Sequence, residues 1–176
     1  FVLVLPPACV IPAWVLNGGY AHATLKELLA LQLTYANQAR PDHDQVGRGK
    51  WARDFRALEE GFRRDRNIPE PLMSGFTILP VPRIGERKGY YLLMRVKEEE
   101  GDEATTCFVC VAWPKEYKKT GVDVYVISED GGVFLYANPD GKFSGLGACP
   151  TLEDIYGEPF NAVTIGKGRV AFLPYR

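Results

Sequence analysis

The stretch TTCFVCVAW (residues 105–113) decides the fold that the sequence predicts. It is apolar at nearly every position, which is typical of a strand buried on both faces in the middle of a sheet. Two further apolar stretches follow it, VDVYVIS (122–128) and VFLYA (133–137), and the turn sequence EDGG (129–132) between them favours a tight hairpin. This part of the chain therefore predicts three neighbouring strands of an antiparallel sheet.

Shorter apolar runs on either side extend this sheet. YYLLMRV (90–96) ends in the charged run KEEEGDE, which predicts a solvated turn leading into the central strand. FTILPV (76–81) is interrupted by proline and suits an edge position, because proline cannot donate a ladder hydrogen bond. AVTI (162–165) and RVAFL (169–173) predict two more short strands.

Two amphipathic segments precede the strands. In ATLKELLALQLTYANQA (23–39), Thr24 and Glu27 have the spacing of a capping box, so we expect a long helix to begin at Thr24. The sequence NGG (17–19) predicts a break in front of it. KWARDFRALEEGFRRD (50–65) repeats large apolar residues at helical spacing and predicts a second helix.

The first helix is apolar over more of its surface than one sheet would cover. Leu31, Leu33 and Tyr35 lie outside the stripe that faces the sheet, so we expect them to contact another surface. The predicted fold is α+β, with one long N-terminal helix packed on a twisted, mostly antiparallel sheet. It forms a single domain over residues 20–176, preceded by an extended apolar arm over residues 1–19.

The arm is defined by its composition. The first sixteen residues, FVLVLPPACVIPAWVL, contain no charged side chain, yet a membrane-spanning helix needs about 20 apolar residues, and three prolines oppose helical geometry. We therefore expect neither a membrane helix nor an ordinary signal sequence, but an extended arm that must be buried to stay ordered. The first residue, Phe1, favours a chain cut from a precursor, with a trimmed chain as the alternative.

Charge and motifs exclude several functional classes. The 21 Lys and Arg residues against 22 Asp and Glu residues give a net charge of −1, which argues against nucleic-acid binding. DHDQVG (42–47) and NPDG (138–141) fit turns better than cation loops, and GLG (145–147) and GKG (166–168) lack the context of a phosphate loop. With two histidines and no nucleophile motif, we expect no enzymatic activity, no cofactor and no metal.

Four cysteines, Cys9, Cys107, Cys110 and Cys149, lack the spacing of a zinc site. Cys107 and Cys110 lie three apart on a strand and point to opposite faces, so a bond between these two would be strained. In a secreted protein, Cys9 and Cys149 would each pair with one of these two cysteines. Four buried free thiols are the alternative.

An apolar N-terminus that starts with Phe, a long helix and then an antiparallel sheet resembles the type IV pilins and pseudopilins. The stretch FVCVAWPKEYKKTGVDVYVISEDGGVFLYANPDG (108–141) also resembles the sheet of a related group of uncharacterised secreted bacterial proteins. The matching elements are a strand ending in Ala-x-Pro (112–114), a Thr-Gly turn (120–121) and a Gly-Gly hairpin (131–132). The chain departs from pilins in having Leu5 where they carry Glu, and in the prolines of its arm.

The resemblance implies a secreted, non-enzymatic subunit of an extracellular surface filament that polymerises with copies of itself and meets a membrane only transiently before assembly. The arm would run into a groove, or along a sheet edge, of a neighbouring subunit. The residues expected at this subunit interface are the following: Phe1, Val2, Leu3, Val4, Leu5, Val10, Ile11, Trp14, Val15, Leu16, Leu31, Leu33 and Tyr35.

Three other interpretations stay open. The arm could fold back on its own domain and give a monomeric envelope protein. The chain could be a secreted binding module in which five exposed tyrosines offer a glycan or peptide face, namely Tyr90, Tyr91, Tyr117, Tyr125 and Tyr136. A hydrolase is the least favoured, because no constellation of catalytic residues can be assembled from the sequence.

Overall fold

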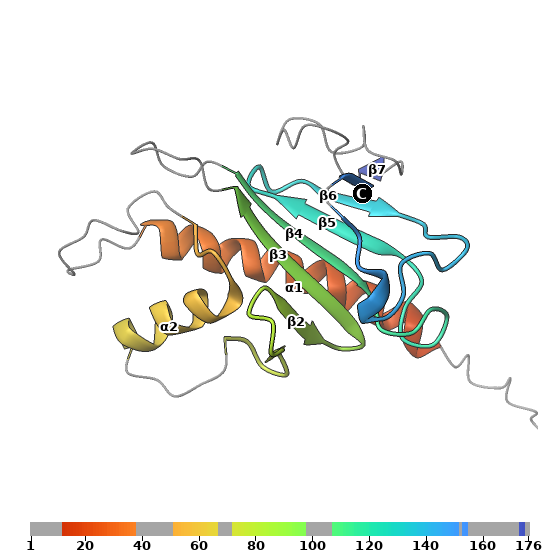
Figure 1. Ribbon diagram of the computed structural model, residues 1–176, viewed down its shortest axis with the longest axis horizontal. Helices are drawn as coiled ribbons and strands as arrows, with labels where there is room; N and C mark the ends of the chain where they lie inside the picture. Colours follow the sequence, from red (N-terminus) through yellow and green to blue (C-terminus); the bar gives the residue numbers. More distant parts are fainter. Residues whose placement is uncertain are drawn as a thin grey trace, which may run out of the picture.

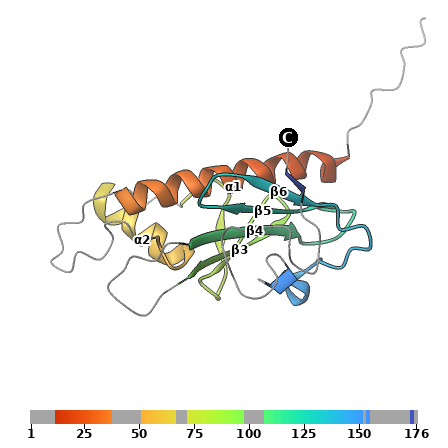
Figure 2. The same ribbon diagram turned by 90° about the horizontal axis from the view of Figure 1, so that it is seen from above.

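The computed structural model describes residues 12–37, 51–66, 72–97, 107–151, 153–154 and 173–174. One long helix, α1 (Ala13–Asn37), lies across one face of an antiparallel sheet, and a shorter helix, α2 (Phe55–Arg66), lies beside the C-terminal part of α1 (Figures 1 and 2). The predicted α+β class and the packing of the long helix on the sheet are therefore confirmed.

The sheet is a meander in which spatial order follows chain order. Its strands are β1 (Thr77–Ile78), β2 (Ile84–Arg87), β3 (Tyr90–Lys97), β4 (Cys107–Pro114), β5 (Val124–Ser128), β6 (Val133–Tyr136) and β7 (Leu173–Pro174). Each strand pairs antiparallel with the next. β4 is central and its side chains from Phe108 to Trp113 are fully buried, as the apolar run predicted. In the part of the chain that the structure describes, both outermost strands, β1 and β7, are two residues long.

β2 is a strand that the sequence analysis missed. It is joined to β3 by Lys88 and Gly89, both of which have positive φ, 48° and 81°, as a two-residue hairpin turn of the primed type requires. The sequence IGER of β2 has low strand propensity, so only the turn could have signalled it. The strand expected at 162–165 lies outside the described residues, and of the one expected at 169–173 only Leu173 is described.

α1 begins at Ala13, eleven residues before the predicted start at Thr24. Val15 N donates to Pro12 O (3.0 Å), and proline is tolerated at a helix start because its missing N–H would have no partner there. Residues 13–19 are therefore helical rather than extended, which corrects this part of the predicted arm. Thr24 caps nothing, since its hydroxyl donates back to Tyr20 O (2.7 Å) inside the helix. Residues 1–11 lie outside the described part of the chain.

The predicted break at residues 17–19 is also wrong, because the glycines serve packing. Gly18 is buried against β5, and a Cβ at this position would lie 2.7 Å from Tyr125 Oη. Gly18 thus allows α1 to approach the sheet closely. Gly19 faces outward, with nothing within 4 Å of where its Cβ would be.

The buried face of α1 and the start of α2 share one core. Leu25, Leu28 and Gln32 of α1 are fully buried, and the Gln32 amide holds a residue just before α2 by donating to Ala52 O (2.9 Å) and accepting from Ala52 N (2.8 Å). Asp54 caps α2 by accepting from Ala57 N (2.8 Å). The predicted second helix is confirmed, with Phe55 and Leu58 fully buried.

The face of the sheet opposite α1, called the second face below, is covered by an irregular segment, residues 138–151, that contains the short 3-10 helix η1 (Leu146–Ala148) (Figure 2). Trp113 Nε1 donates to Gly145 O (2.8 Å) and fixes this segment to β4. Phe143 is buried against Val111, Trp113 and their neighbours, which makes a second apolar cluster. The sheet is therefore buried on both faces at its centre.

Candidate interaction surfaces

The first turn of α1, Ala13–Leu16, is exposed on every side. Successive residues of a helix point about 100° apart, so these four residues sample its whole circumference. Trp14, Val15 and Leu16 expose 39%, 46% and 51% of their surface, and the buried face of the helix begins only at Gly18. This turn thus presents three large apolar side chains to solvent.

From Leu16 onward, α1 exposes one face along its length, called the outward ridge below. Its residues are Leu16, Gly19, Tyr20, Ala23, Lys26, Glu27, Ala30, Leu33, Thr34 and Asn37. Their spacing of three and four places them on the side away from the sheet, where no described element lies beyond α1 (Figure 2). The ridge is therefore an open, largely uncharged helix surface.

The two charged residues of the outward ridge are held by the domain. Lys26 Nζ donates to Gly131 O (2.8 Å) in the β5–β6 turn. Glu27 Oε2 accepts from Arg87 Nη1 of β2 (2.5 Å) on the other side of the helix. Each charge thus has a partner while its side chain remains partly exposed.

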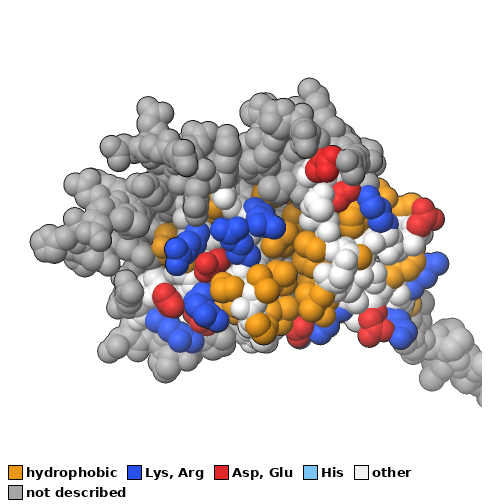
Figure 3. All heavy atoms as spheres, in the orientation of Figure 1, with side chains coloured by type: hydrophobic (Ala, Val, Ile, Leu, Met, Phe, Trp, Pro, Cys, Tyr) orange, Lys and Arg blue, Asp and Glu red, His pale blue; other side chains and the backbone are white. Residues whose placement is uncertain are grey.

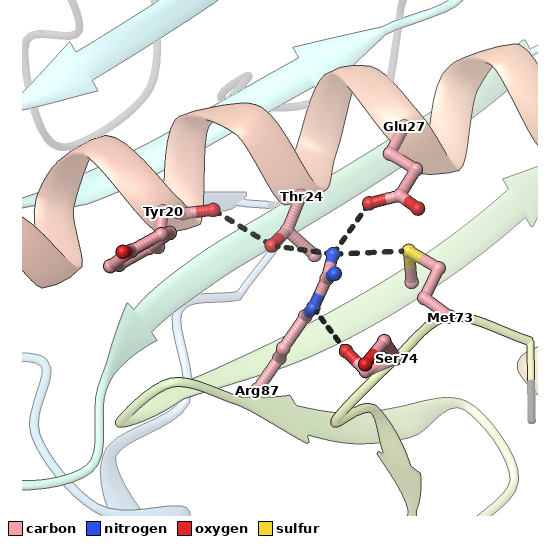
Figure 4. Close-up of polar contacts among 6 residues, drawn as sticks. All are labelled: Tyr20, Thr24, Glu27, Met73, Ser74 and Arg87. Carbon is pink, nitrogen blue, oxygen red and sulfur yellow. Dashed lines mark hydrogen bonds and ion pairs between the residues drawn. The ribbon is translucent and has the colours of Figure 1, made fainter.

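Arg87 is the centre of the largest polar cluster that joins α1 to the sheet (Figure 4). Its Nε donates to Ser74 O (3.0 Å), and its Nη1 contacts Thr24 Oγ1 (3.3 Å) as well as Glu27. Met73 Sδ lies 3.5 Å from the same nitrogen. Since protein groups occupy these donors, the cluster acts as a brace between α1, β2 and the turn before β1.

The structure separates the three helix residues that were predicted for the subunit interface. Leu33 lies on the outward ridge and exposes 42% of its surface. Leu31 is half-buried against the core. Tyr35 is in the core with 8% exposed, since helical periodicity puts it on the same face as Leu28 and Gln32. The predicted interface residues of the arm that the structure does not describe are Phe1, Val2, Leu3, Val4, Leu5, Val10 and Ile11.

The second face of the sheet carries a partly exposed apolar surface (Figure 3). Tyr91 and Tyr136 are half-buried at its margin, and Lys115 Nζ lies 5.4 Å from the centre of the Tyr91 ring. Lys142 Nζ lies 4.6 Å from the centre of the Phe143 ring. Figure 3 shows basic side chains beside the apolar ones, so this surface combines aromatic rings with positive charge.

The five tyrosines proposed for a single binding face do not share one, which is a correction. Tyr90 and Tyr125 are buried between α1 and the sheet, because alternate residues of a strand point to opposite faces. Tyr91 and Tyr136 lie on the second face. Tyr117 lies in the turn after β4, where its hydroxyl donates to Pro139 O (2.5 Å).

Burial also shifts the pKa values of two acidic side chains beside the helix–sheet core. It raises the pKa values of Tyr90 and Asp123, and the Tyr90 hydroxyl lies where a side chain at Gly121 would have to fit. Burial thus opposes ionisation of both groups. The Tyr90 ring is packed tightly against Gly121.

Cys110 and Cys149 lie on opposite faces of the sheet and are both free thiols. Burial raises the pKa of Cys110, and it raises the pKa of Cys149 to about 11. Both sulfurs are thus protonated near neutral pH and are poor nucleophiles. Both predicted pairing schemes place Cys110 and Cys149 in disulfides, so these free thiols contradict them, while Cys9 and the side chain of Cys107 lie outside the described residues.

The turn NPDG (138–141) is a structural element. The Asn138 amide donates to Val122 O (3.1 Å) and Phe143 O (3.0 Å), and its oxygen accepts from Phe143 N (3.1 Å), which leaves little capacity for a cation. GLG (145–147) overlaps η1, and the motifs at 42–47 and 166–168 lie outside the described residues. Among the described residues, no three His, Cys, Asp or Glu side chains cluster as metal ligands would.

No described helix combines the length and the apolar character needed to cross a membrane. No protein-family model, no curated protein and no solved structure matches the chain.

Proposed function

We propose that the chain is a non-enzymatic structural subunit, secreted and assembled into an extracellular filament, in which the N-terminal apolar segment and the first turn of α1 are buried in a neighbouring subunit. The observation that supports this most is the exposure of Trp14, Val15 and Leu16 on different sides of one helical turn. Full burial of a large apolar side chain is worth about 1.5–3 kcal/mol, so three of them provide a substantial driving force for association. The partner is another copy of the chain, and no cofactor is required.

The short edge strands of the sheet favour insertion of side chains into a groove over addition of a strand to an edge. A strand added to an edge gains stability from backbone hydrogen bonds, and within the described ranges the outermost strands β1 and β7 are two residues long. We therefore favour insertion of apolar side chains into a groove of the neighbour. Such a head-to-tail contact builds a fibre when its rotation does not close the copies into a ring.

The test is to examine the full chain and two matched variants by negative-stain electron microscopy and by sedimentation. Val15→Glu places a charge in the first turn of α1, whereas Val81→Glu places the same charge at a site that is equally apolar and 55% exposed in the β1–β2 turn. We expect fibres from the unmodified chain and from the Val81→Glu variant. We expect the Val15→Glu variant to remain soluble and short of fibres, because the buried carboxylate would lack a partner.

A chain that stays monomeric, with residues 1–16 protected from proteolysis, would overturn the proposal and support the monomeric envelope protein. Fibres of unchanged length from the Val15→Glu variant would equally overturn it. Either result would exclude burial of the first turn of α1 in a neighbouring subunit. Neither result would test contacts made by other surfaces of the chain.

The second candidate function is a secreted binding module that uses the second face of the sheet. The half-exposed ring of Tyr91 with Lys115 beside it favours this function, since aromatic rings and cations together bind glycans or acidic peptides. Titration with glycan and acidic-peptide panels would detect it. Binding lost in the Tyr91→Ala variant would support it, and binding that survives would exclude this surface.

A further inference from the structure

Three segments that are distant in sequence meet at the end of the domain where α1 begins (Figure 1). Asn17 Nδ2 of α1 donates to Thr120 O in the β4–β5 loop (2.9 Å). A Cβ at Gly89, in the β2–β3 turn, would lie 2.8 Å from the Thr120 side chain and 3.2 Å from Asn17 Nδ2. The three segments thus form one surface, called the basal end below, which comprises residues 13–20, 88–89 and 115–123.

The basal end exposes four large apolar side chains on the first two turns of α1. Trp14, Val15 and Leu16 lie on the first turn, and Tyr20, with 51% of its surface exposed, follows Leu16 on the same side of the helix. Trp and Tyr are enriched where proteins meet lipid headgroups, because each combines an apolar ring with a polar N–H or O–H group. The composition of this surface therefore suits the interface between water and a bilayer.

Two lysines of the basal end add positive charge beside these side chains. Lys88 Nζ lies 5.5 Å from the centre of the Tyr20 ring, and Lys118 Nζ lies 5.2 Å from the centre of the Tyr117 ring. No carboxylate of the described residues forms an ion pair with Lys88 or Lys118. The other charged side chains of this end have partners, namely Lys115 with Glu86, Lys119 with Glu116, and Asp123 with Tyr125.

The backbone at both lysines favours a different residue. Lys88 and Lys118 have φ of 48° and 60°, in the left-handed region where glycine and asparagine are preferred. Asparagine is also the residue typical of the hairpin turn that Lys88 begins. Lysine at these two positions thus costs stability while it supplies charge, and a ligand of opposite charge would account for it.

We propose that the basal end binds the surface of a bilayer that contains anionic lipids. The apolar side chains of residues 14–20 enter the headgroup region, and Lys88 and Lys118 contact lipid phosphates. The charge of the lysines selects anionic lipids, and the exposed aromatic and aliphatic side chains select a bilayer over a free anion. The N-terminus of α1 adds partial positive charge at the same place.

This contact goes beyond the proposed filament function, because its partner is lipid and it requires two loops of the sheet as well as α1. A copy whose first turn is buried in a neighbouring subunit cannot place that turn in lipid. The two contacts are therefore alternative states of the first turn, and they differ in their need for Lys88 and Lys118.

The experiment is flotation of the full chain with vesicles on a density gradient, in which vesicle-bound protein rises and fibres sink. One set of vesicles contains phosphatidylcholine alone, and the other contains equimolar phosphatidylcholine and phosphatidylglycerol. We expect the chain to float with the anionic vesicles and to stay behind with the neutral ones. Added salt should weaken the binding, because it screens the lysines.

The variant Lys88→Asn/Lys118→Asn removes both charges and leaves a residue that suits the backbone. We expect its partition coefficient on anionic vesicles to fall by about 30-fold. The matched control, Arg53→Gln/Arg56→Gln, removes the same charge from two exposed residues at the start of α2, beside the C-terminal part of α1, and should bind normally. Circular dichroism verifies the fold of both variants.

Tryptophan fluorescence tests whether the first turn of α1 enters the lipid. Trp113 is fully buried and Trp51 is half-buried, whereas Trp14 exposes 39% of its surface. Anionic vesicles should therefore shift the emission of the unmodified chain to shorter wavelength. We expect the Trp14→Phe variant to float as before but to lose this shift.

Several results would overturn the proposal: no binding to anionic vesicles, equal binding to neutral ones, equal losses in the two double variants, or an unchanged emission shift in Trp14→Phe. The lysine variant should still form fibres, because its first turn is unchanged, so failure of the filament proposal would leave the flotation result intact. A lysine variant that loses fibres but still floats would assign these lysines to a subunit contact and overturn the lipid contact.

Discussion

The two faces of the sheet are covered by different kinds of structure. α1 satisfies its own backbone hydrogen bonds, so it can cover the sheet with apolar side chains such as Leu25 and Leu28. The segment 138–151 is irregular, and its backbone groups need partners from side chains, such as Asn138 and Trp113. Stability on the helix side should therefore depend on apolar volume, and stability on the second face on a few directed hydrogen bonds.

The largest expected effect is on the helix side. Leu28 is fully buried, and Leu28→Ala should lower the free energy of unfolding by about 2–5 kcal/mol through lost burial and a residual cavity. Leu33→Ala on the outward ridge is the matched control and should change it by about 0.5 kcal/mol or less. Urea denaturation at low protein concentration measures both. If both variants lowered the free energy of unfolding equally, the buried face of α1 would not be the main source of stability on the helix side of the sheet.

A smaller effect is expected at Asn138 on the second face. Asn138→Ala removes three hydrogen bonds from a residue with φ of 46°, and should cost about 1–3 kcal/mol. Asn138→Gly retains the backbone conformation and isolates the loss of the hydrogen bonds. Amide exchange should accelerate at Phe143 and stay unchanged in the middle of α1. Faster exchange at both places would mean that the two faces are not held independently.

The smallest effect concerns pH, at the end of the segment that covers the second face. Burial raises the pKa of Asp154, but hydrogen bonds from Lys142 (2.9 Å) and Thr151 outweigh it and hold the pKa below its usual 3.8. A lowered pKa means that the ionised Asp154 stabilises the fold above pH 4, and that this stability is lost as the pH falls through the lowered value. Asp154→Asn should thus cost about 0.5–1 kcal/mol at pH 7 and converge with the unmodified chain in acid. Melting temperatures between pH 2 and 7 test this, and a constant difference would exclude the ionised carboxylate as the cause.

Local patterns predicted the elements whose signal is contained in one stretch of sequence. The spacing of Phe55 and Leu58 predicted α2, and the unbroken apolar run at 105–113 predicted the central position of β4. Such signals depend only on the period of a helix or a strand. They needed no knowledge of the rest of the chain.

The misplaced features depend on contacts distant in sequence. Gly18 looked like a helix break because its partner, Tyr125, is supplied by β5. β2 escaped notice because its stability comes from pairing with β1 and β3 rather than from its own residues. The outward ridge could have been derived from helical periodicity once the true start of α1 was known. The grouping of Tyr90 with Tyr91 contradicted strand alternation, a rule that the sequence alone supplies.

The chain order of the meander has a consequence for biosynthesis. Because each strand pairs with the one made just before it, the sheet can grow one strand at a time as the ribosome releases the chain. α1 is made before the strands, and those that it packs against most, β4 and β5, emerge much later. Until β4 and β5 have been synthesised, the leucines of the nascent helix stay exposed. A chaperone that binds the helix during translation would act mainly in this period.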